Sequence, residues 1–269
     1  MTSMIYPTTN PAMSETMVVA RAEGPYIYDK QGKRYLEGMA GLWCTALGYG
    51  NEEIIEAAER QMRELSFSHM FGGKTHSSAI ELADKLAAMV PLQDGRVFLG
   101  NSGSDANDTL LKLVRYHAEA SGQPNRIKVI AREQGYHGVT LASAALTAIP
   151  TNHAHFQLPF EALGVLRTGS ANYYRGANDG ESEADFVARR AQELEALILA
   201  EGPETIAAMI AEPVSGAGGV IVPPEGYFEA IQAVLDRYGI WLWDDEVICG
   251  FGRLGTDFGA NKMGMRPQM

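Results

Sequence analysis

Short, continuously apolar segments alternate with helical segments through the second half of this chain of 269 residues, and that alternation constrains its fold more than any other feature. A strand without polar residues on either face is buried on both faces, which is typical of a parallel sheet covered by helices. We therefore expect an α/β fold, with a mostly parallel (mixed) sheet and helices on both faces. The predicted strands cover residues 96–100, 127–131, 205–212 and 240–247.

Apolar residues at helical spacing, together with capping signals, place the predicted helices. Around the strands, these helices cover residues 104–120, 139–145, 186–200 and 225–238. Ahead of the first strand, Asn51 is the predicted N-cap of one helix, and Pro91 ends another helix over residues 78–90.

The N-terminal part of the chain has a different pattern. Residues 26–38 alternate between apolar and polar around the turn at 29–32, which predicts a β-hairpin, whereas residues 1–23 are expected to be irregular. We expect residues 1–45 to form an N-terminal segment with a hairpin, as part of a small domain, and residues 46–269 to form a large domain.

The charge and the cysteine content limit which binding partners and which cellular compartment we expect for this protein. The formal charge is −11, which argues against nucleic acid or an anionic membrane as the main partner, because both require a basic surface. The two cysteines, Cys44 and Cys249, lie far apart and form no Cys-x-x-Cys motif, so they indicate reduced thiols. With no apolar signal region at the N-terminus and no run of about 18 apolar residues, we expect a soluble, cytoplasmic protein.

Residues that follow the first predicted strand carry a possible phosphate site. Ligands of parallel sheets bind beyond the carboxyl ends of the strands. There, Ser102, Gly103 and Ser104 open a helix, and a helix N-terminus offers free N–H groups and a positive dipole end to an anion. An ordinary N-cap without a ligand explains this segment equally well.

Aromatic and acidic residues follow the other predicted strands. Tyr136 and His137 could stack on a flat ligand or belong to the core, and Glu212 could be a solvated loop acid. Asp244 and Asp245 end an apolar strand, where a buried carboxylate requires a partner, either a cationic ligand or a local group such as Arg253. A phosphate cradle, an aromatic side chain and a buried acid are together what pyridoxal 5′-phosphate (PLP) requires, because its ring nitrogen must stay protonated.

At this point the chain resembles the class III (omega) aminotransferases of PLP fold type I, over about residues 6–269. The resemblance is greatest to the branch that transfers amino groups from amines or β-alanine to pyruvate. The motifs that carry it are AGLWC (40–44), NSGSDAND (101–108), GYHG (135–138), AEPVSGAGGVIVPP (211–224) and DDEVICGFGRLG (244–255).

The resemblance implies a role for each matching residue. It implies that the cofactor phosphate is held at the helix start, that an aromatic ring stacks on the pyridine, and that an acid pairs with the pyridinium nitrogen. Those cofactor-binding residues are Ser102, Gly103 and Ser104 for the phosphate, Tyr136 stacked on the ring with His137 supporting it, Asp245 at the nitrogen, Val247 on the opposite ring face, and Glu212 hydrogen-bonding near Asp245 and the phenolic side of the ring; Leu42 and Trp43 are expected to line the substrate pocket.

The same resemblance implies ping-pong transamination by a homodimer, with an amine or amino acid as donor and a keto acid, such as pyruvate, as acceptor. It places the Schiff-base lysine roughly five residues past Met269 and implies that this chain lacks both that lysine and the C-terminal domain. The chain alone is therefore expected to be inactive.

Three alternatives remain from the residues themselves. Gly250, Gly252 and Gly255 match the G-x-G-x-x-G pattern of NAD-dependent dehydrogenases, although the following residues have poor helical periodicity. A non-catalytic protein of the PLP fold, acting as a dimerisation partner, would share the cofactor residues. A metal site is not expected, because His153 and His155 lack acids or cysteines at ligand spacing.

Overall fold

A computed structural model describes residues 3–7, 10, 12 and 16–269 of the chain. The chain forms two compact units, residues 1–76 and 77–269, which are described one at a time. The expected functional division, with a small domain up to residue 45 and a cofactor-binding domain after it, stays a prediction.

The first unit contains a three-stranded antiparallel sheet. Its strands, in spatial order, are β1 (Val19–Glu23), β2 (Tyr26–Asp29) and β3 (Arg34–Leu36). The predicted hairpin is confirmed as β2 and β3, and Asp29 closes its turn by accepting hydrogen bonds from the N–H groups of Gln31 and Lys33. The prediction that residues 1–23 are irregular is wrong for β1, because polar side chains suit a strand whose faces are exposed.

Two helices follow this sheet in the described part of the first unit. The short α1 (Ala40–Trp43) follows the sheet, and α2 (Glu52–Glu64) begins after Asn51, whose side chain accepts a hydrogen bond from the N–H of Ile54. The predicted N-cap is therefore confirmed.

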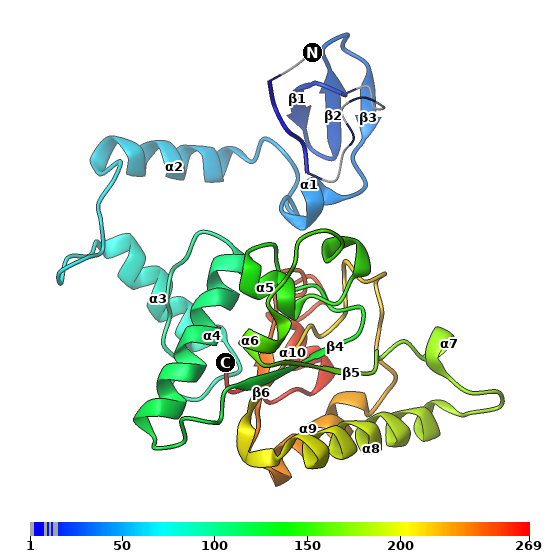
Figure 1. Cartoon of the computed structure of the whole chain (residues 1–269). Coiled ribbons are helices and arrows are strands. Elements are labelled where there is room, and N and C mark those ends of the chain that lie inside the picture. Colours follow the sequence, from blue (N-terminus) through cyan, green and yellow to red (C-terminus); the bar gives the residue numbers. More distant parts are fainter. Residues whose placement is uncertain (1–2, 8–9, 11, 13–15) are drawn as a thin grey trace. The chain divides into compact units, whose positions relative to one another are not determined.

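The second unit is built around a four-stranded parallel sheet (Figure 1). Its spatial order is β5-β4-β6-β7, and all its described strands run parallel. The strands are β4 (Lys128–Arg132), β5 (Val165–Thr168), β6 (Ile206–Ala211) and β7 (Trp241–Asp244).

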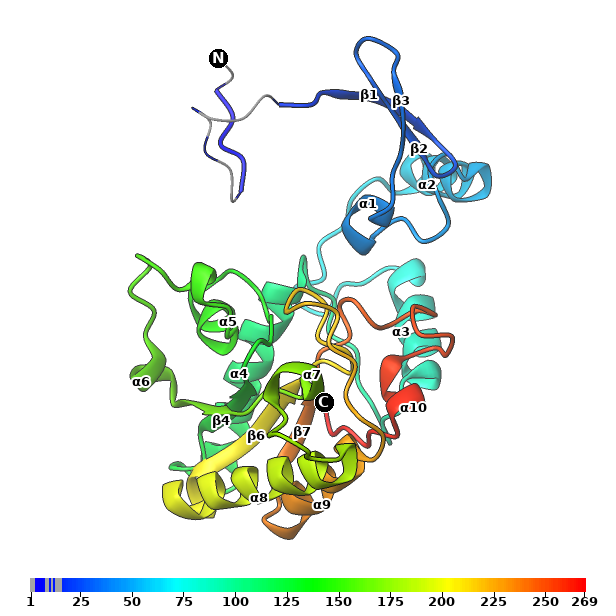
Figure 2. The same ribbon diagram turned by 90° about the vertical axis from the view of Figure 1, so that its right-hand side faces the viewer.

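Helices cover both faces of this sheet, as expected from the apolar strands (Figure 2). Ile130, Met209 and Leu242 pack with α8 and α9, whereas Val129, Ile210 and Trp243 pack with α4 and α5. The helices of this unit are α3 (Ser77–Met89), α4 (Gly103–Ala120), α5 (Leu141–Leu146), α6 (Phe160–Leu163), α7 (Tyr173–Gly176), α8 (Glu183–Glu201), α9 (Tyr227–Arg237) and α10 (Gly259–Met263). None of the helices in the described part of the chain has the length and apolarity needed to span a membrane.

One predicted strand, residues 96–100, is wrong. This segment forms no ladder with any described residue, and the Phe98 side chain is exposed. A short apolar run satisfies the sequence criterion for a strand, but a strand also needs the edge of a neighbour to bond to. Conversely, β5 was missed, because its four residues include the charged Arg167 in an otherwise short apolar run.

The strand order locates the crevice where a ligand would bind. From β4 the chain passes through α5 and α6 to β5 on one side, whereas from β6 it passes through α9 to β7 on the other side. The direction of connection therefore reverses between β4 and β6, and ligands of open parallel sheets bind at such a switch point, beyond the carboxyl ends of the strands.

Candidate cofactor site

The start of α4 forms one side of this crevice. Ser102 is its N-cap and accepts a hydrogen bond from the N–H of Asp105. The N–H groups of Gly103 and Ser104 precede the first intrahelical bond, which runs from Ala106 to the Ser102 carbonyl. Such N–H groups at a positive dipole end suit a phosphate.

Val247 lies against this helix start and explains the glycine. A Cβ on Gly103 would come within 2.6 Å of Val247 Cγ2, so any larger residue would displace that side chain. The exposed Val247 thus packs over Gly103 and projects from the turn after β7.

The turn after β4 places Tyr136 and His137 at the carboxyl edge of the sheet. The N–H of His137 donates to Thr147 Oγ1 at 2.8 Å, and Ser104 Oγ accepts from the N–H of Val139 at 3.0 Å. Gly138 has a φ of +131°, and a Cβ there would lie 2.4 Å from Ser104 Oγ. Only glycine therefore allows this turn to lie so close to the start of α4.

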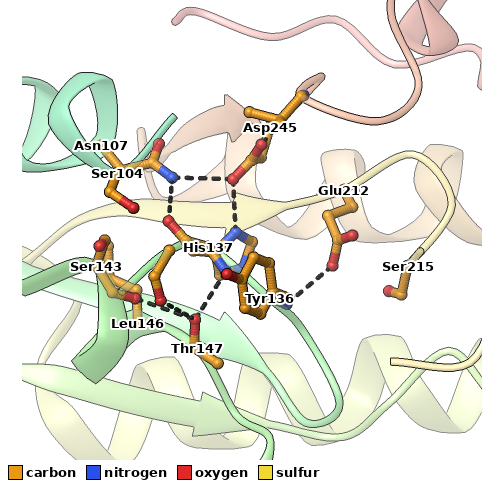
Figure 3. Close-up of polar contacts among 12 residues, drawn as sticks. Ser104, Asn107, Tyr136, His137, Ser143, Leu146, Thr147, Glu212, Ser215 and Asp245 are labelled. Carbon is orange, nitrogen blue, oxygen red and sulfur yellow. Dashed lines mark hydrogen bonds and ion pairs between the residues drawn. The ribbon is translucent and has the colours of Figure 1, made fainter. Parts of the chain in front are cut away.

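Asp245 lies at the centre of the site (Figure 3). Its Oδ2 accepts hydrogen bonds from His137 Nδ1 at 2.9 Å and from Asn107 Nδ2 at 2.9 Å, and its Oδ1 accepts a longer bond of 3.3 Å from the N–H of Val247. The residue is 6% exposed. Burial acts to raise the pKa of Asp245, but the hydrogen bond from His137, the electrostatic attraction of its ring and the hydrogen bond from Asn107 outweigh burial and hold the pKa below its ordinary value.

His137 makes a contact that the resemblance did not imply, whereas its implied role beside Tyr136 stays a prediction. Its ring bonds directly to Asp245 and is 3% exposed, so it holds the acid in addition to flanking Tyr136. Its Nε2 is buried and has no hydrogen-bond partner among the described residues.

Asn107 is a site residue that the sequence reasoning missed. It is buried within α4, and its amide also donates to the His137 carbonyl at 2.7 Å. A signal was present: Asn107 is on the same helical face as Leu111, Val114 and Ala118, so an amide occupied a core position. A buried amide requires hydrogen-bond partners, and that requirement points to a polar network.

Glu212 follows β6 and is 3% exposed. Its two carboxylate oxygens accept from the N–H groups of Tyr136 at 3.0 Å and Gly216 at 2.9 Å, and burial raises the pKa of this carboxyl. The acid thereby fixes the backbone that carries Tyr136. Its implied hydrogen bond near Asp245 and the phenolic side of the cofactor ring stays a prediction.

Asp244 lies on the opposite face of β7 from Asp245. Side chains alternate along the strand, so Asp244 shares the face of Leu242, toward α9. Its Oδ1 is buried without a hydrogen-bond partner among the described residues. Burial, followed by repulsion from Glu246, raises the pKa of Asp244 to about 9. The alternative in which both acids pair with Arg253 is wrong for Asp245, which pairs with His137 and Asn107.

The expected substrate-pocket residues, Leu42 and Trp43, belong to the first unit, so their role stays a prediction. Leu42 is exposed, and both have left-handed backbone angles, with φ of 59° and 65°. Left-handed conformations are costly for residues other than glycine, and such strain often accompanies functional sites.

The two alternative sites gain no support from the geometry. Turns follow Gly250, and the next helix, α10, begins only at Gly259 and has five residues, whereas a dinucleotide fingerprint opens directly into a helix. His153 Nε2 is bonded to the Thr147 carbonyl at 2.6 Å. Within residues 3–7, 10, 12 and 16–269, no three His, Cys, Asp or Glu side chains are grouped so that they could hold a metal ion.

These residues fit a phosphorylated pyridine. The N–H groups of Gly103 and Ser104 at the start of α4 are available to a phosphate, and the ionised Asp245 can hold a protonated ring nitrogen with its less engaged Oδ1. Tyr136 lies between Glu212 and His137 in Figure 3, at the same edge of the sheet.

The chain is similar to transaminases in sequence and in fold. The family model of aminotransferase class-III matches residues 8–269. A probable mitochondrial γ-aminobutyrate transaminase 2 of Oryza sativa subsp. indica is 49% identical over 95% of this chain and 51% of its own length, and a chloroplastic γ-aminobutyrate transaminase 3 of Solanum lycopersicum is 48% identical over 95% of this chain and 49% of its own length. A crystal structure of the omega transaminase from Pseudomonas jessenii in complex with PMP is 50% identical, with a TM-score of 0.95 over 98% of this chain and 58% of that chain.

The chain spans about half the length of the curated relatives it matches. Its parallel sheet is that of the PLP fold type I transaminases, as expected from the strand pattern and the motifs. The match over residues 8–269 covers nearly all of the sequence and includes every residue of the Asp245 site, and class III aminotransferases depend on PLP. The chain therefore belongs to the class III aminotransferases.

Proposed function

We propose that this chain is the front part of a PLP-dependent transaminase that moves an amino group from an amine or amino acid to a keto acid. The observation that carries the proposal is the buried, ionised Asp245, held by Asn107 and His137 close to the start of α4. The donors keep this carboxylate anionic, and its less engaged Oδ1 can hold a protonated pyridine nitrogen.

Each residue of the site has a task in holding the cofactor. The N–H groups of Gly103 and Ser104 bind the phosphate, Tyr136 covers one ring face and Val247 the other, and Asp245 keeps the ring nitrogen protonated. When bound, the protonated ring withdraws electrons from the substrate carbon, which makes its proton acidic.

The lysine that anchors the cofactor is proposed to follow Met269. The N–H of Gln268 donates to the Leu242 carbonyl, and the N–H of Asp244 donates to the Met269 carbonyl, so the last residues run alongside β7 in the same direction. A continuation of this path leads to the carboxyl end of β7, where Asp245 lies.

The lysines nearest the sheet in sequence are engaged elsewhere. Lys128 begins β4, at the end of the sheet away from the site, and pairs with Glu201 at 2.8 Å. Lys112 and Lys262 are exposed on α4 and α10. These positions support an anchoring lysine outside this sequence.

The donor and acceptor are proposed from the relatives. The named γ-aminobutyrate transaminases suggest an ω-amino acid donor, and the omega transaminases suggest amines. Pyruvate is the proposed acceptor, in a ping-pong reaction carried out by a cytoplasmic homodimer.

The proposal is tested by measuring alanine formed from pyruvate with γ-aminobutyrate, β-alanine or a simple primary amine. The gene product that continues past Met269 is expected to give alanine, with parallel double-reciprocal lines when both substrates are varied. The 269-residue chain alone is expected to bind pyridoxamine 5′-phosphate without turnover. Clear turnover by the 269-residue chain would refute the proposal that the anchoring lysine lies outside this sequence. If neither protein bound the cofactor, the proposed function itself would be refuted.

A further inference from the structure

Asn107 connects the three segments that form the cofactor site. It lies on α4 one turn after Gly103 and Ser104, and its amide reaches the His137 carbonyl at 2.7 Å and Asp245 Oδ2 at 2.9 Å (Figure 3). It therefore links the helix of the proposed phosphate site to the turn after β4 and to the residue that follows β7.

The orientation of this amide follows from chemistry. Both groups that face it, a backbone carbonyl and a carboxylate, are acceptors only. The Asn107 NH₂ must therefore point at them, because an amide oxygen there would repel both. The residue is 4% exposed, so bulk solvent has little access to these hydrogens.

The two donors on Asp245 are arranged unequally. Asn107 and His137 both bond to Oδ2, whereas Oδ1 receives only the 3.3 Å bond from Val247. This arrangement fixes the carboxylate plane and leaves Oδ1 as the oxygen with capacity for another partner.

We propose that Asn107 is a positioning residue that keeps Asp245 ionised and directs Asp245 Oδ1 at the ring nitrogen of the cofactor. The inference rests on the proposed function and extends it to a residue that touches neither phosphate nor ring. A purely structural Asn107 would stabilise the fold without influencing the protonation of a bound ring.

The test uses pyridoxamine 5′-phosphate labelled with ¹⁵N at the ring nitrogen. This form has no aldehyde, so it cannot bond covalently to surface lysines. The ¹⁵N chemical shift reports whether the ring nitrogen carries a proton, and its pH titration gives the midpoint at which the proton is lost.

The variant Asn107→Leu, similar in size, removes both hydrogen bonds. We expect the midpoint of the ring-nitrogen titration to fall and the cofactor to bind roughly 10-fold more weakly, as for the loss of one charge-assisted hydrogen bond. Leu111→Ala is the matched control, because Leu111 is buried on the same face of α4. It should lower the melting temperature without moving the ring-nitrogen midpoint.

Asn107→Asp provides a second variant if the leucine side chain prevents folding. It preserves size but places a carboxylate beside Asp245, so the two acids should share a proton and the cofactor affinity should fall as the pH rises. Unchanged midpoint and affinity in a folded Asn107 variant would overturn the inference alone. Failure of the unaltered protein to bind the cofactor would overturn the proposed function together with it.

Discussion

Asp244 and Asp245 are neighbours in the sequence but lie in opposite environments on the two faces of β7. Asp245 faces α4 and receives two hydrogen bonds on one oxygen, so its pKa is lowered despite burial. Asp244 faces α9, and burial followed by repulsion from Glu246 raises its pKa to about 9. The difference shows that donors, rather than exposure, decide which buried acid stays ionised.

The other acid of this segment, Glu246, has a structural task. Its two oxygens accept from the N–H groups of Gly259 at 2.9 Å and Ala260 at 2.7 Å, so it caps the start of α10. The Glu246 carboxylate is therefore engaged as a helix cap, whereas Asp244 Oδ1 has no donor among the described residues.

The largest effect is expected for Asp245→Asn. A neutral amide cannot hold the ring nitrogen protonated, so pyridoxamine 5′-phosphate should bind roughly 10- to 100-fold more weakly. Isothermal titration calorimetry measures the cofactor affinity of both single variants. Asp244→Asn should bind the cofactor as tightly as the unaltered chain, because Asp244 faces away from the site. Equal losses in the two variants would mean that the faces of β7 do not differ as described.

The next effect concerns pH and Asp244. Its pKa is raised in the folded state, so its contribution favours folding most at low pH and is lost as the pH rises from about 4 to about 9. Asp244→Asn should remove this loss and raise the free energy of unfolding at pH 8 by on the order of several kcal/mol, and by less at pH 5. Urea unfolding at pH 5 and pH 8 tests the slope, and a variant that keeps the unaltered slope would contradict the assignment.

A smaller effect is expected for Thr147→Val. The valine retains the shape of this fully buried side chain but leaves the N–H of His137 without its acceptor, at a cost of about 1–3 kcal/mol in unfolding free energy. Ser215→Ala is the comparison variant, which removes the hydroxyl that accepts a hydrogen bond from Arg132. It should cost less, because the same Arg132 nitrogen also bonds to the Glu212 carbonyl. The reverse ranking in thermal unfolding would count against this view of the network.

The smallest effect is expected at the other end of the sheet. Lys128 and Glu201 form an ion pair with side chains 30% and 35% exposed, so Lys128→Met should change stability by about 0.5 kcal/mol. Unfolding in low and high salt tests this expectation. The difference in unfolding free energy between the unaltered chain and Lys128→Met should shrink with salt. The loss of cofactor affinity in Asp245→Asn should persist, because that acid is buried.

Much of this organisation was predictable from local patterns. Apolar runs predicted three of the four strands of the parallel sheet, and the capping residue Asn51 predicted the start of α2. The predicted strand at residues 96–100 and the missed β5 show the limit, because pairing depends on which edges lie close in space.

The sequence by itself determined where chemistry could occur, since residues that follow parallel strands meet at one edge of the sheet. It also determined that Asp244 and Asp245 point in opposite directions, because strand side chains alternate. Only the tertiary structure decided which of them receives Asn107, which lies 138 residues away, and His137, which lies 108 residues away. The physical reason is that a buried charge is stabilised by donors from distant segments, and packing alone brings those segments together.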